Sequence, residues 1–475
     1  MQSPKRYDFC IFGAGISGLS MAWTLKQAGF NVVVLEKERD AGGVIKTRSE
    51  EGFMMEWGPN STMATSDKVL KMIKDIGLED RIAFANKLAR NRYIVRGGKL
   101  QALPMSPPAL ITSRLLTFRG KLRLIGEIFV KARKDGADES LAQFVERRLG
   151  KEALTYLINP FVAGVYAGKP EDLCVRTAFK RLYALEQNYG GMIRGGIAKA
   201  REKRKDKTTQ VKDPSKAGLF SFDKGMQVLP MGLWDKLADE VKTQCEAESI
   251  TREDDFYIVH YKNRRNETEQ FAASQIIFTT PSYVTAKYIE KLDAALATTL
   301  HGIRYARIAC VFHGFKKETV KHSLNGFGML IPEIEKRKIL GSLWNSTLFP
   351  GRAPEGHALL STFIGGERHP DMVLYDDEDL QKIALQELDD LLGFTQSPVF
   401  TSIHRVKKAI PQYRLGHTKV IADIEAFEQA NPGLHIRGNY RNGISVVDCI
   451  DKSIEFAEEL AGKTIPVAPV FSVNS

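Results

Sequence analysis

Apolar and polar positions divide the start of the chain into a strand, a helix and a second strand. Residues 7–12 form a short, mostly apolar run, which is typical of a strand buried in a parallel sheet. A glycine-rich turn leads into a helical stretch from Leu19 to Ala28, which Gly29 stops. A second apolar run, 31–35, ends at Glu36. This order predicts an α/β domain built on a parallel sheet.

Residues 90–104 predict a hairpin with its turn at Gly97-Gly98. Alternation along its first strand predicts two faces, with Arg92, Ile94 and Arg96 on one and Tyr93 and Val95 on the other. Strands are also expected at 256–261 and 275–280, and a second, mostly antiparallel sheet is expected from 308–312, 328–331, 340–344 and 358–363. A helix over 377–392 and a C-terminal strand, loop and helix complete the pattern.

The pattern from 105 to 168 is helical, with one helix beginning at Asp138 or Ser140 and ending at Gly150. Upstream, four apolar residues with basic neighbours have the spacing of one helix face: Phe118, Leu122, Ile125 and Phe129. The spacing fits a core helix with solvated basic edges, which it favours when taken alone, or a surface that lies on an anionic bilayer. Residues 194–218, which include the charged run 201–207, predict a mobile solvated loop.

Composition excludes a disordered chain, because 43% of the 475 residues are hydrophobic, and this length predicts two or three domains. The net charge of +11 favours an anionic partner, while the absence of interleaved aromatic and basic residues argues against nucleic acid. Five scattered cysteines predict reduced thiols, with neither disulfides nor a zinc site. No apolar run approaches the roughly 20 residues of a spanning helix. With no room for a signal peptide before the first strand, we expect a soluble or monotopic protein of the bacterial cytoplasm.

The candidate chemistry starts in the turn after the first strand. Residues 13–18 (Gly-Ala-Gly-Ile-Ser-Gly) form a GxGxxG motif between strand and helix. Gly13 permits the tight turn, Gly15 lets the backbone approach a pyrophosphate, and Gly18 lets the helix pack on the sheet. The helix N-terminus offers free N–H groups to the phosphates, and Glu36 is placed to bind a ribose diol. The whole unit predicts a dinucleotide site.

A second glycine pair, Gly42-Gly43, favours FAD over NAD because it lets another loop close on the dinucleotide. The stretch 42–48 and the residues 56–60 (Glu-Trp-Gly-Pro-Asn) resemble the flavin-containing amine oxidase superfamily. This resemblance implies that Gly58 and Pro59 lie near the flavin ring. Near the C-terminus a glycine-ended strand again runs into a helix, so we expect this segment to return to the flavin.

From end to end the chain resembles one family within that superfamily, the protoporphyrinogen oxidases. The segments that carry the resemblance are 159–168 (NPFVAGVYAG), 220–226, 326–332 (GFGMLIP), 340–343, 349–354 (FPGRAP), 361–366 (STFIGG), 409–413 and 443–446. The resemblance implies an amine-oxidase fold, like that of p-hydroxybenzoate hydroxylase, of mixed α/β and α+β class. Its expected parts are a Rossmann-type FAD-binding domain (1–88, 216–285, 406–475), a helical membrane-binding domain with a substrate-facing hairpin (89–215) and a mixed-sheet substrate domain (286–405). The apolar face near 118–129 then becomes a membrane surface.

The family pattern also implies the site residues. Arg92 pairs with a substrate propionate, Gly164 offers its carbonyl to a pyrrole N–H, and three residues form apolar walls: Leu330, Leu343 and Phe363. The non-covalent FAD is expected to contact Gly13, Ala14, Gly15, Ser17, Gly18, Glu36, Lys37, Gly42, Gly43, Lys46, Gly58, Pro59, Asn60, Ser61, Ala247, Asn439, Ser445, Val446 and Val447. Two positions depart from the pattern, since Lys46 replaces a frequent Arg and Ala247 an expected Val.

The implied reaction is the six-electron oxidation of protoporphyrinogen IX in haem biosynthesis, with hydride passing to flavin N5 and dioxygen becoming hydrogen peroxide. No catalytic side chain or metal is expected, since the flavin carries the chemistry. Coproporphyrinogen III remains an alternative substrate, and the chain could also be another flavin amine oxidase or desaturase, or a non-catalytic haem-pathway carrier. The implied partners are the tetrapyrrole, the inner-membrane surface, ferrochelatase and a second copy in a homodimer.

Overall fold

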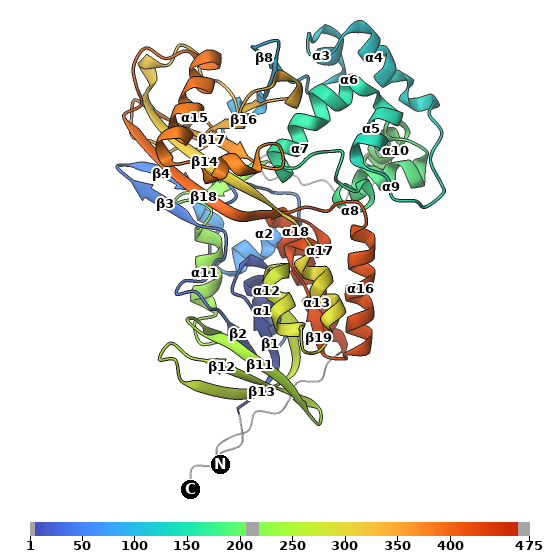
Figure 1. Cartoon of the computed structure of the whole chain (residues 1–475), viewed down its shortest axis with the longest axis vertical. Helices are drawn as coiled ribbons and strands as arrows, with labels where there is room; N and C mark the ends of the chain where they lie inside the picture. The colour runs from blue at the N-terminus through green and yellow to red at the C-terminus, as the bar shows by residue number, and fades with distance from the viewer. Residues whose placement is uncertain (1–4, 206–217, 464–475) are drawn as a thin grey trace.

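Two large sheets and a group of helices make up the molecule (Figure 1). The computed structural model describes residues 5–205 and 218–463. Within these residues each large sheet has seven strands. In Figure 1 the first sheet lies at the lower end, the second at the upper left, and the helices from α3 to α10 at the upper right. The expected mixed α/β and α+β class is confirmed.

The first sheet has the strand order β10–β2–β1–β13–β12–β11, with β19 beside β13. Its strands are β1 (Arg6–Phe12), β2 (Val32–Leu35), β10 (Val241–Lys242), β11 (Glu246–Glu253), β12 (Phe256–Lys262), β13 (Thr268–Phe278) and β19 (Leu434–Ile436). Because β1 pairs in parallel with β2 and β13, the predicted parallel sheet is confirmed. The register puts the last residues of β1, β2, β13 and β19 in one row. The segments that follow these strands therefore start at the same sheet edge.

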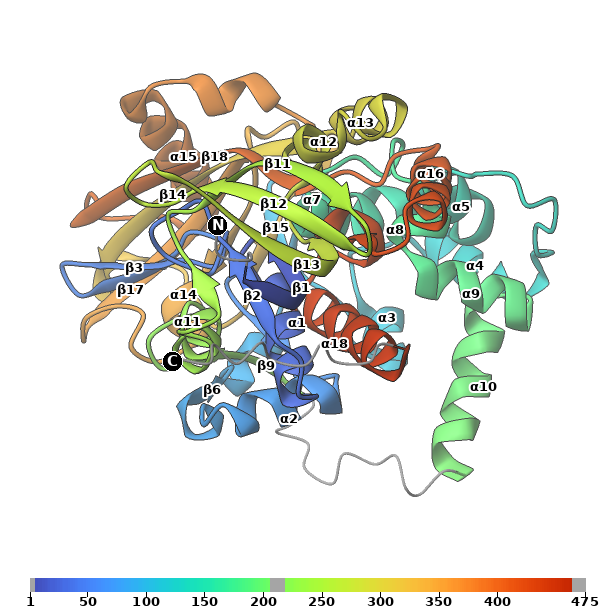
Figure 2. The same cartoon turned by 90° about the horizontal axis from the view of Figure 1, so that it is seen from below.

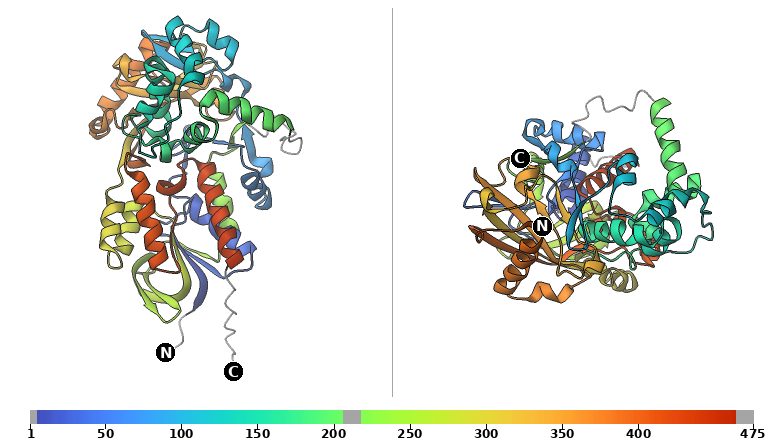
Figure 3. Two further views of the ribbon diagram at one scale, coloured as in Figure 1. Left: turned by 90° about the vertical axis from the view of Figure 1, so that its right-hand side faces the viewer. Right: turned by 90° about the horizontal axis from the view of Figure 1, so that it is seen from above.

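Helices cover both faces of this sheet (Figure 3). On one face α1 (Ile16–Gln27), α2 (Asp67–Asp75), α11 (Val228–Lys236) and α18 (Val446–Lys463) share one apolar core. On the other face lie α12 (Ser282–Ile289), α13 (Ala294–His301) and α16 (His417–Ala430). Since α18 packs directly on α1, the C-terminal segment returns to the unit where the sequence predicts the flavin.

The second sheet has the order β18–β14–β17–β16–β15–β7–β8. Its strands are β7 (Tyr93–Arg96), β8 (Lys99–Ala102), β14 (Tyr305–Lys316), β15 (Gly328–Leu330), β16 (Ile339–Trp344), β17 (His357–Gly365) and β18 (Phe400–Pro411). The predicted hairpin forms as β7 and β8, but it pairs in parallel with β15 and so extends this sheet. Helix α15 (Asp377–Leu392) covers one face. The boundary expected at 405 falls inside β18, and the one expected at 285 falls inside α12.

Smaller elements connect the two sheets. They are β3 (Thr47–Glu50), β4 (Phe53–Glu56), β5 (Thr62–Met63), β6 (Ile82–Phe84), β9 (Leu219–Phe222), α14 (Asn345–Leu348) and α17 (Asn439–Asn442). Short helical turns also occur at η1 (Glu79–Arg81), η2 (Lys87–Arg90), η7 (Lys317–Thr319), η8 (Glu333–Glu335) and η9 (Pro370–Leu374). Strand β9 pairs with both β5 and β6, which ties the segment after 218 to the N-terminal part of the chain.

The helical region runs from α3 to α10. Its elements are α3 (Pro107–Thr112), α4 (Phe118–Ile125), η3 (Gly126–Phe129), α5 (Leu141–Leu149), α6 (Lys151–Ala153), η4 (Leu154–Ile158), α7 (Asn159–Tyr166), α8 (Val175–Ala178), α9 (Lys180–Tyr189) and α10 (Met192–Lys205). Ser140 caps α5 with a complete capping box, as predicted. None of the described helices is long and apolar enough to span a bilayer.

The apolar face of α4 and η3 points to solvent. Exposed fractions are 74% for Phe118, 52% for Leu122, 61% for Ile125 and 84% for Phe129. The interpretation of this stretch as a core helix is therefore wrong. Periodicity indicated an amphipathic helix, but it cannot tell whether protein covers the apolar face.

Helix α10 corrects another prediction, because residues 194–205 are helical where a mobile loop was expected. The segment lacks an apolar face, yet from Ile197 onward it consists mainly of Ala, Lys, Arg and Glu, which are strong helix formers. The helix projects from the molecule in Figure 2. The remainder of the predicted loop, 206–217, lies outside the described residues.

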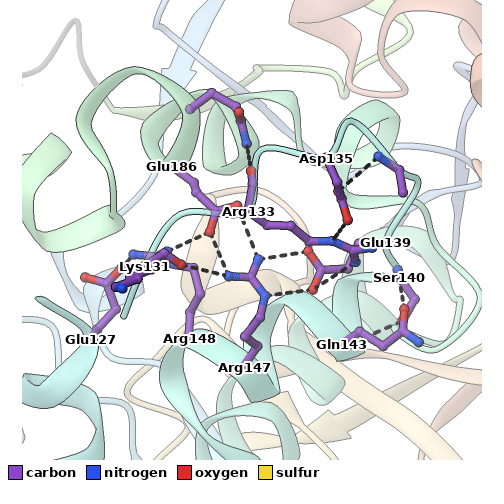
Figure 4. Close-up of polar contacts among 12 residues, drawn as sticks. Glu127, Lys131, Arg133, Asp135, Glu139, Ser140, Gln143, Arg147, Arg148 and Glu186 are labelled. Carbon is purple, nitrogen blue, oxygen red and sulfur yellow. Dashed lines mark hydrogen bonds and ion pairs between the residues drawn. The ribbon is translucent and has the colours of Figure 1, made fainter. Parts of the chain in front are cut away.

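An ion-pair cluster holds the helical region together (Figure 4). The fully buried Arg148 donates to Glu127 through Nε at 2.7 Å and to Glu186 through Nη1 at 2.6 Å. Glu127 also accepts the backbone N–H groups of Met192 and Ile193, at 2.9 and 3.0 Å. Burial raises the pKa of Glu127, but these N–H bonds and Arg148 outweigh burial and lower it overall. The cluster therefore joins η3 and α5 to the first turn of α10.

Candidate active site

In the glycine turn between β1 and α1, two glycines are required by the fold and the third leaves space for a ligand. Gly13 has φ +100°, and a Cβ at Gly18 would clash with the Gly13 carbonyl oxygen. Gly15 has an ordinary φ of −73°, and a Cβ there would meet nothing within 4 Å. The fold therefore requires Gly13 and Gly18 but not Gly15. Space beside Gly15, at the N-terminus of α1, fits the predicted approach of a pyrophosphate.

Glu36 lies at the same sheet edge. One carboxylate oxygen accepts the Ala14 N–H and the other the Glu38 N–H, each at 2.8 Å. The Cys245 N–H donates to the Glu36 carbonyl at 2.8 Å, and the buried Ala247 follows two residues later in β11. Lys37 extends away to an exposed ion pair with Glu246 at 2.8 Å.

The second glycine pair closes on the first turn. The Gly42 N–H donates to the Ala14 carbonyl at 2.7 Å, and a Cβ at Gly43 would come within 3.2 Å of the Gly15 Cα. A Cβ at Gly58 would clash with the Val44 carbonyl. The two loops and the segment after β4 are therefore packed closely against one another.

A buried ion pair holds the end of β4, from which residues 58–61 extend. Arg352 Nη2 lies 3.3 Å from Glu56 Oε1, and both side chains are almost fully buried. Burial raises the pKa of Glu56 and lowers that of Arg352. Glu56 also accepts the Met226 N–H at 2.9 Å. This pair was missed from the sequence, where the arginine of the FPGRAP segment, about 300 residues later, was its only signal.

Beyond this point, Pro59, Asn60 and Ser61 lead toward the second sheet. The Asn60 side-chain oxygen accepts Asn345 Nδ2 at 3.0 Å. Lys46 is exposed and contributes to the lowered pKa of His404, of which burial is the larger cause. The His404 ring stacks on Trp57 with a centroid distance of 4.4 Å, which agrees with a structural role for this histidine.

The C-terminal segment completes the predicted cofactor group. Asn439 starts α17, and Ser445 Oγ accepts the Asp448 N–H at 3.1 Å in the first turn of α18. Ser17 lines one small cavity together with Gly438 and Gly443. The buried Val446 and Val447 belong to the same core as α1. Residues from four distant parts of the chain therefore meet at one sheet edge.

The predicted substrate residues share one face of the second sheet. Leu330 is in register with Gly341, and Gly341 with Phe363, while Leu343 follows Gly341 by two residues. Ile94 of β7 is in register with Leu330, so Arg92 is placed on the same face by alternation. Tyr93 and Val95 point to the opposite face, where they pack in the core under α15. The predicted alternation of the hairpin is confirmed.

Helix α7 lies against this face. A Cβ at Gly164 would come within 2.7 Å of Leu330 Cδ2, so glycine allows the close approach. Phe161 and Val165, on the same side of α7, are 42% and 41% exposed. Leu330, Leu343 and Phe363 are each half-buried. An apolar surface formed by sheet and helix results, which we call the apolar face.

Two arginines of the hairpin differ in their pairing. The Arg92 guanidinium lies 5.1 Å above the Phe327 ring and has no carboxylate partner among the described residues. Burial of this group lowers its pKa. Arg96, by contrast, donates to Glu152 at 3.0 Å. Of these two arginines, Arg92 is therefore the one that is available to an anionic ligand.

Comparisons with known proteins show which family has this arrangement. Residues 16–461 match the family model described as flavin containing amine oxidoreductase. The chloroplastic protoporphyrinogen oxidase of Nicotiana tabacum is 33% identical, over 96% of this chain and 85% of that protein. The coproporphyrinogen III oxidase of Bacillus subtilis (strain 168) is 26% identical, over 93% and 95%. A crystal structure from Exiguobacterium sp. 255-15 superimposes with a TM-score of 0.77 at 24% identity, covering 98% of this chain and all of that one. The chain therefore belongs to the flavin-containing amine oxidoreductases, in the group of the protoporphyrinogen oxidases.

Proposed function

We propose that this flavin-dependent oxidoreductase oxidises protoporphyrinogen IX to protoporphyrin IX in haem biosynthesis, with dioxygen as acceptor and hydrogen peroxide as product. The observation that carries the proposal is the apolar face with the Arg92 guanidinium at its edge, which has no carboxylate partner in the described part of the chain. A porphyrinogen is a broad apolar molecule with carboxylates on one side, so it needs this combination. The names of the relatives above 30% identity support the same substrate.

The proposed flavin is FAD. Two glycine loops, an acidic side chain at the end of β2 and the N-terminus of α1 together fit a dinucleotide. The loops and the helix N-terminus suit its pyrophosphate, and the acidic side chain suits a ribose. When bound, FAD supplies the hydride acceptor. The chain's own residues hold the pyrophosphate at Gly15 and the ribose at Glu36.

The apolar face would then position the substrate. Leu330, Leu343 and Phe363 contact the macrocycle and exclude water, while the Gly164 carbonyl accepts a pyrrole N–H. Arg92 binds a propionate, and its planar guanidinium suits a carboxylate better than an ammonium group does. The wall residues and Arg92 extend from the second sheet and Gly164 from the facing helix, so the substrate is oriented between two rigid elements.

Coproporphyrinogen III is the second candidate, since coproporphyrinogen III oxidases match at 26–27% identity. It carries two more propionates than protoporphyrinogen IX and would be favoured by a more basic site. Glu152 neutralises Arg96, so that of Arg92 and Arg96 only Arg92 lacks a carboxylate partner among the described residues, which supports the substrate with fewer carboxylates.

The deciding experiment follows porphyrin fluorescence as the purified protein reacts with each porphyrinogen in turn. We expect kcat/KM for protoporphyrinogen IX to exceed that for coproporphyrinogen III. The reverse order would exchange the two assignments. A protein with bound flavin that oxidises neither substrate would contradict both and would indicate another flavin amine oxidase or desaturase.

Replacing Arg92 tests the substrate site. Arg92→Ala is expected to raise KM by roughly ten- to a hundredfold, because a charged hydrogen bond contributes about 1.5 to 3 kcal/mol. The turnover number should change less, since a propionate remote from the reacting carbon binds ground and transition states alike. Arg92→Lys should recover only part of the loss.

The matched control is Arg252→Ala, because Arg252 also lies over an aromatic ring, Tyr257 at 5.7 Å, but on the first sheet. It should leave KM unchanged. Wild-type kinetics of Arg92→Ala on both porphyrinogens, or loss of flavin from it, would show that Arg92 is not a substrate residue.

We also propose that the exposed apolar side chains of α4 and η3 rest on a membrane surface. Changing Phe118, Leu122 and Phe129 together to Ser should reduce co-sedimentation with anionic vesicles at least severalfold, because it removes the apolar area that enters the bilayer. Binding of the wild type should persist at high salt, since apolar insertion does not weaken with salt as surface charge pairing does. Leu292→Ser with Val399→Ser, which removes exposed apolar residues elsewhere, is the control. Equal sedimentation of both variants and the wild type would contradict this membrane contact.

A further inference from the structure

A hydrogen-bonded row of polar side chains crosses from the predicted flavin loop into the second sheet. Asn345, the first residue of α14, is 3% exposed. Its Nδ2 donates to Asn60 Oδ1 at 3.0 Å, and its own Oδ1 accepts the Ser361 hydroxyl at 2.8 Å. Ser361 is fully buried and lies beside Leu343 in the sheet register. This row of polar side chains therefore reaches the apolar face among the wall residues.

Polar groups in such a place are costly unless their hydrogen bonds are satisfied. Here both ends of the Asn345 amide are engaged, with its oxygen toward Ser361 and its nitrogen toward Asn60. The same geometry sets the orientation of Asn60, whose oxygen faces Asn345. Asn60 is half-buried, and its Nδ2 donates to no group among the described residues. Asn60 therefore presents an N–H donor on the side away from Asn345.

We propose that Asn345 is a positioning residue, which holds the Asn60 amide so that its N–H groups point toward the flavin. The inference rests on the proposed function. A pyrrole N–H of the substrate is itself a donor and cannot pair with an N–H group, whereas the flavin ring carries acceptors. A donor to that ring becomes more effective as electron density builds up on it, so the contact favours the transition state over the ground state.

A double-mutant cycle tests this role. We expect Asn345→Ala and Asn60→Ala each to lower kcat about tenfold, which corresponds to about 1.4 kcal/mol, with KM changed less than twofold. In the Asn60→Ala background, Asn345→Ala should have no further effect, because Asn345 acts only through Asn60. Asn345→Leu keeps the side-chain volume and should behave as Asn345→Ala does, so loss of packing is controlled.

The visible absorption spectrum of the bound flavin provides a readout that does not depend on turnover. Asn345→Ala should shift it in the same direction as Asn60→Ala. The control is Thr347→Val, which removes another hydrogen bond of α14, from Thr347 Oγ1 to the Leu324 carbonyl at 2.8 Å, and should leave spectrum and kcat unchanged.

Multiplicative losses in the double variant, or an unshifted spectrum in both Asn345 variants, would overturn the proposal. If the wild type oxidises neither porphyrinogen, the proposed substrate fails while the spectra still decide the role of Asn345. The failures of the two proposals are therefore distinguishable.

Discussion

Gly15→Val is expected to fold normally and to purify without flavin. The fold does not need glycine here, because φ is ordinary and a Cβ would meet no protein atom within 4 Å. A branched side chain would instead occupy the space that a pyrophosphate needs at the N-terminus of α1. We expect a loss of at least a hundredfold in FAD affinity, or about 2.8 kcal/mol. The measurement is flavin absorbance per protein, with circular dichroism to verify folding.

Gly18→Ala is the contrasting variant. Its Cβ would clash with the Gly13 carbonyl, so the variant should lower thermal stability as well as flavin content. Gly126→Ala controls for glycine replacement elsewhere, because Gly126 has an ordinary φ of −64° and a Cβ there would meet nothing within 4 Å. Stoichiometric FAD in a folded Gly15→Val protein would contradict the proposed pyrophosphate position.

Arg148→Ala should lower the free energy of unfolding of the helical region by about 3 to 5 kcal/mol, because it leaves Glu127 buried without a counter-charge and Glu186 with Arg147 as its remaining cation. The Glu127 carboxylate also accepts the first N–H groups of α10, so we expect α10 to lose its anchor. Urea denaturation followed by circular dichroism at 222 nm measures the loss. Vesicle binding should fall with it, since η3 carries both Glu127 and the exposed Phe129.

Arg133→Ala serves as the matched control, because Arg133 forms an exposed ion pair with Asp135 in the same region. Its loss should leave the urea midpoint nearly unchanged, because exposed ion pairs contribute little to stability. Combining Arg148→Met with Glu127→Gln and Glu186→Gln should restore much of the stability, since no buried charge is then left alone. If Arg148→Ala unfolds at the same urea concentration as Arg133→Ala, the cluster does not hold the helices.

Features whose causes are local were predictable from the sequence. The strand, glycine turn, helix, strand and acid of the dinucleotide unit all lie within the first 36 residues, and each follows from short-range backbone chemistry. Helix α15 spans the predicted 377–392, because Asp376 caps its start and Gly393, at φ +69°, ends it. The family pattern added the identities of the predicted substrate residues.

Helix α10 and the apolar face of α4 show where pattern reasoning failed. In α10, intrinsic propensity and the Glu127 cap produce a helix without an apolar stripe, so a periodicity criterion excluded it. In α4 the stripe is present, but the number of layers that pack against a helix depends on the path of the rest of the chain.

The other features of the fold and of the candidate site depend on pairing between residues that are far apart in the sequence. Arg92, Leu330 and Phe363 share one face only because β7, β15, β16 and β17 adopt one register, and a shift by a single residue would turn any of them to the opposite face. Glu56 with Arg352, and Asn60 with Asn345, are about 290 residues apart in sequence. Hydrophobic patterning indicates which side of an element is apolar. Which buried polar groups meet depends on strand order, and strand order results from the packing of the whole chain.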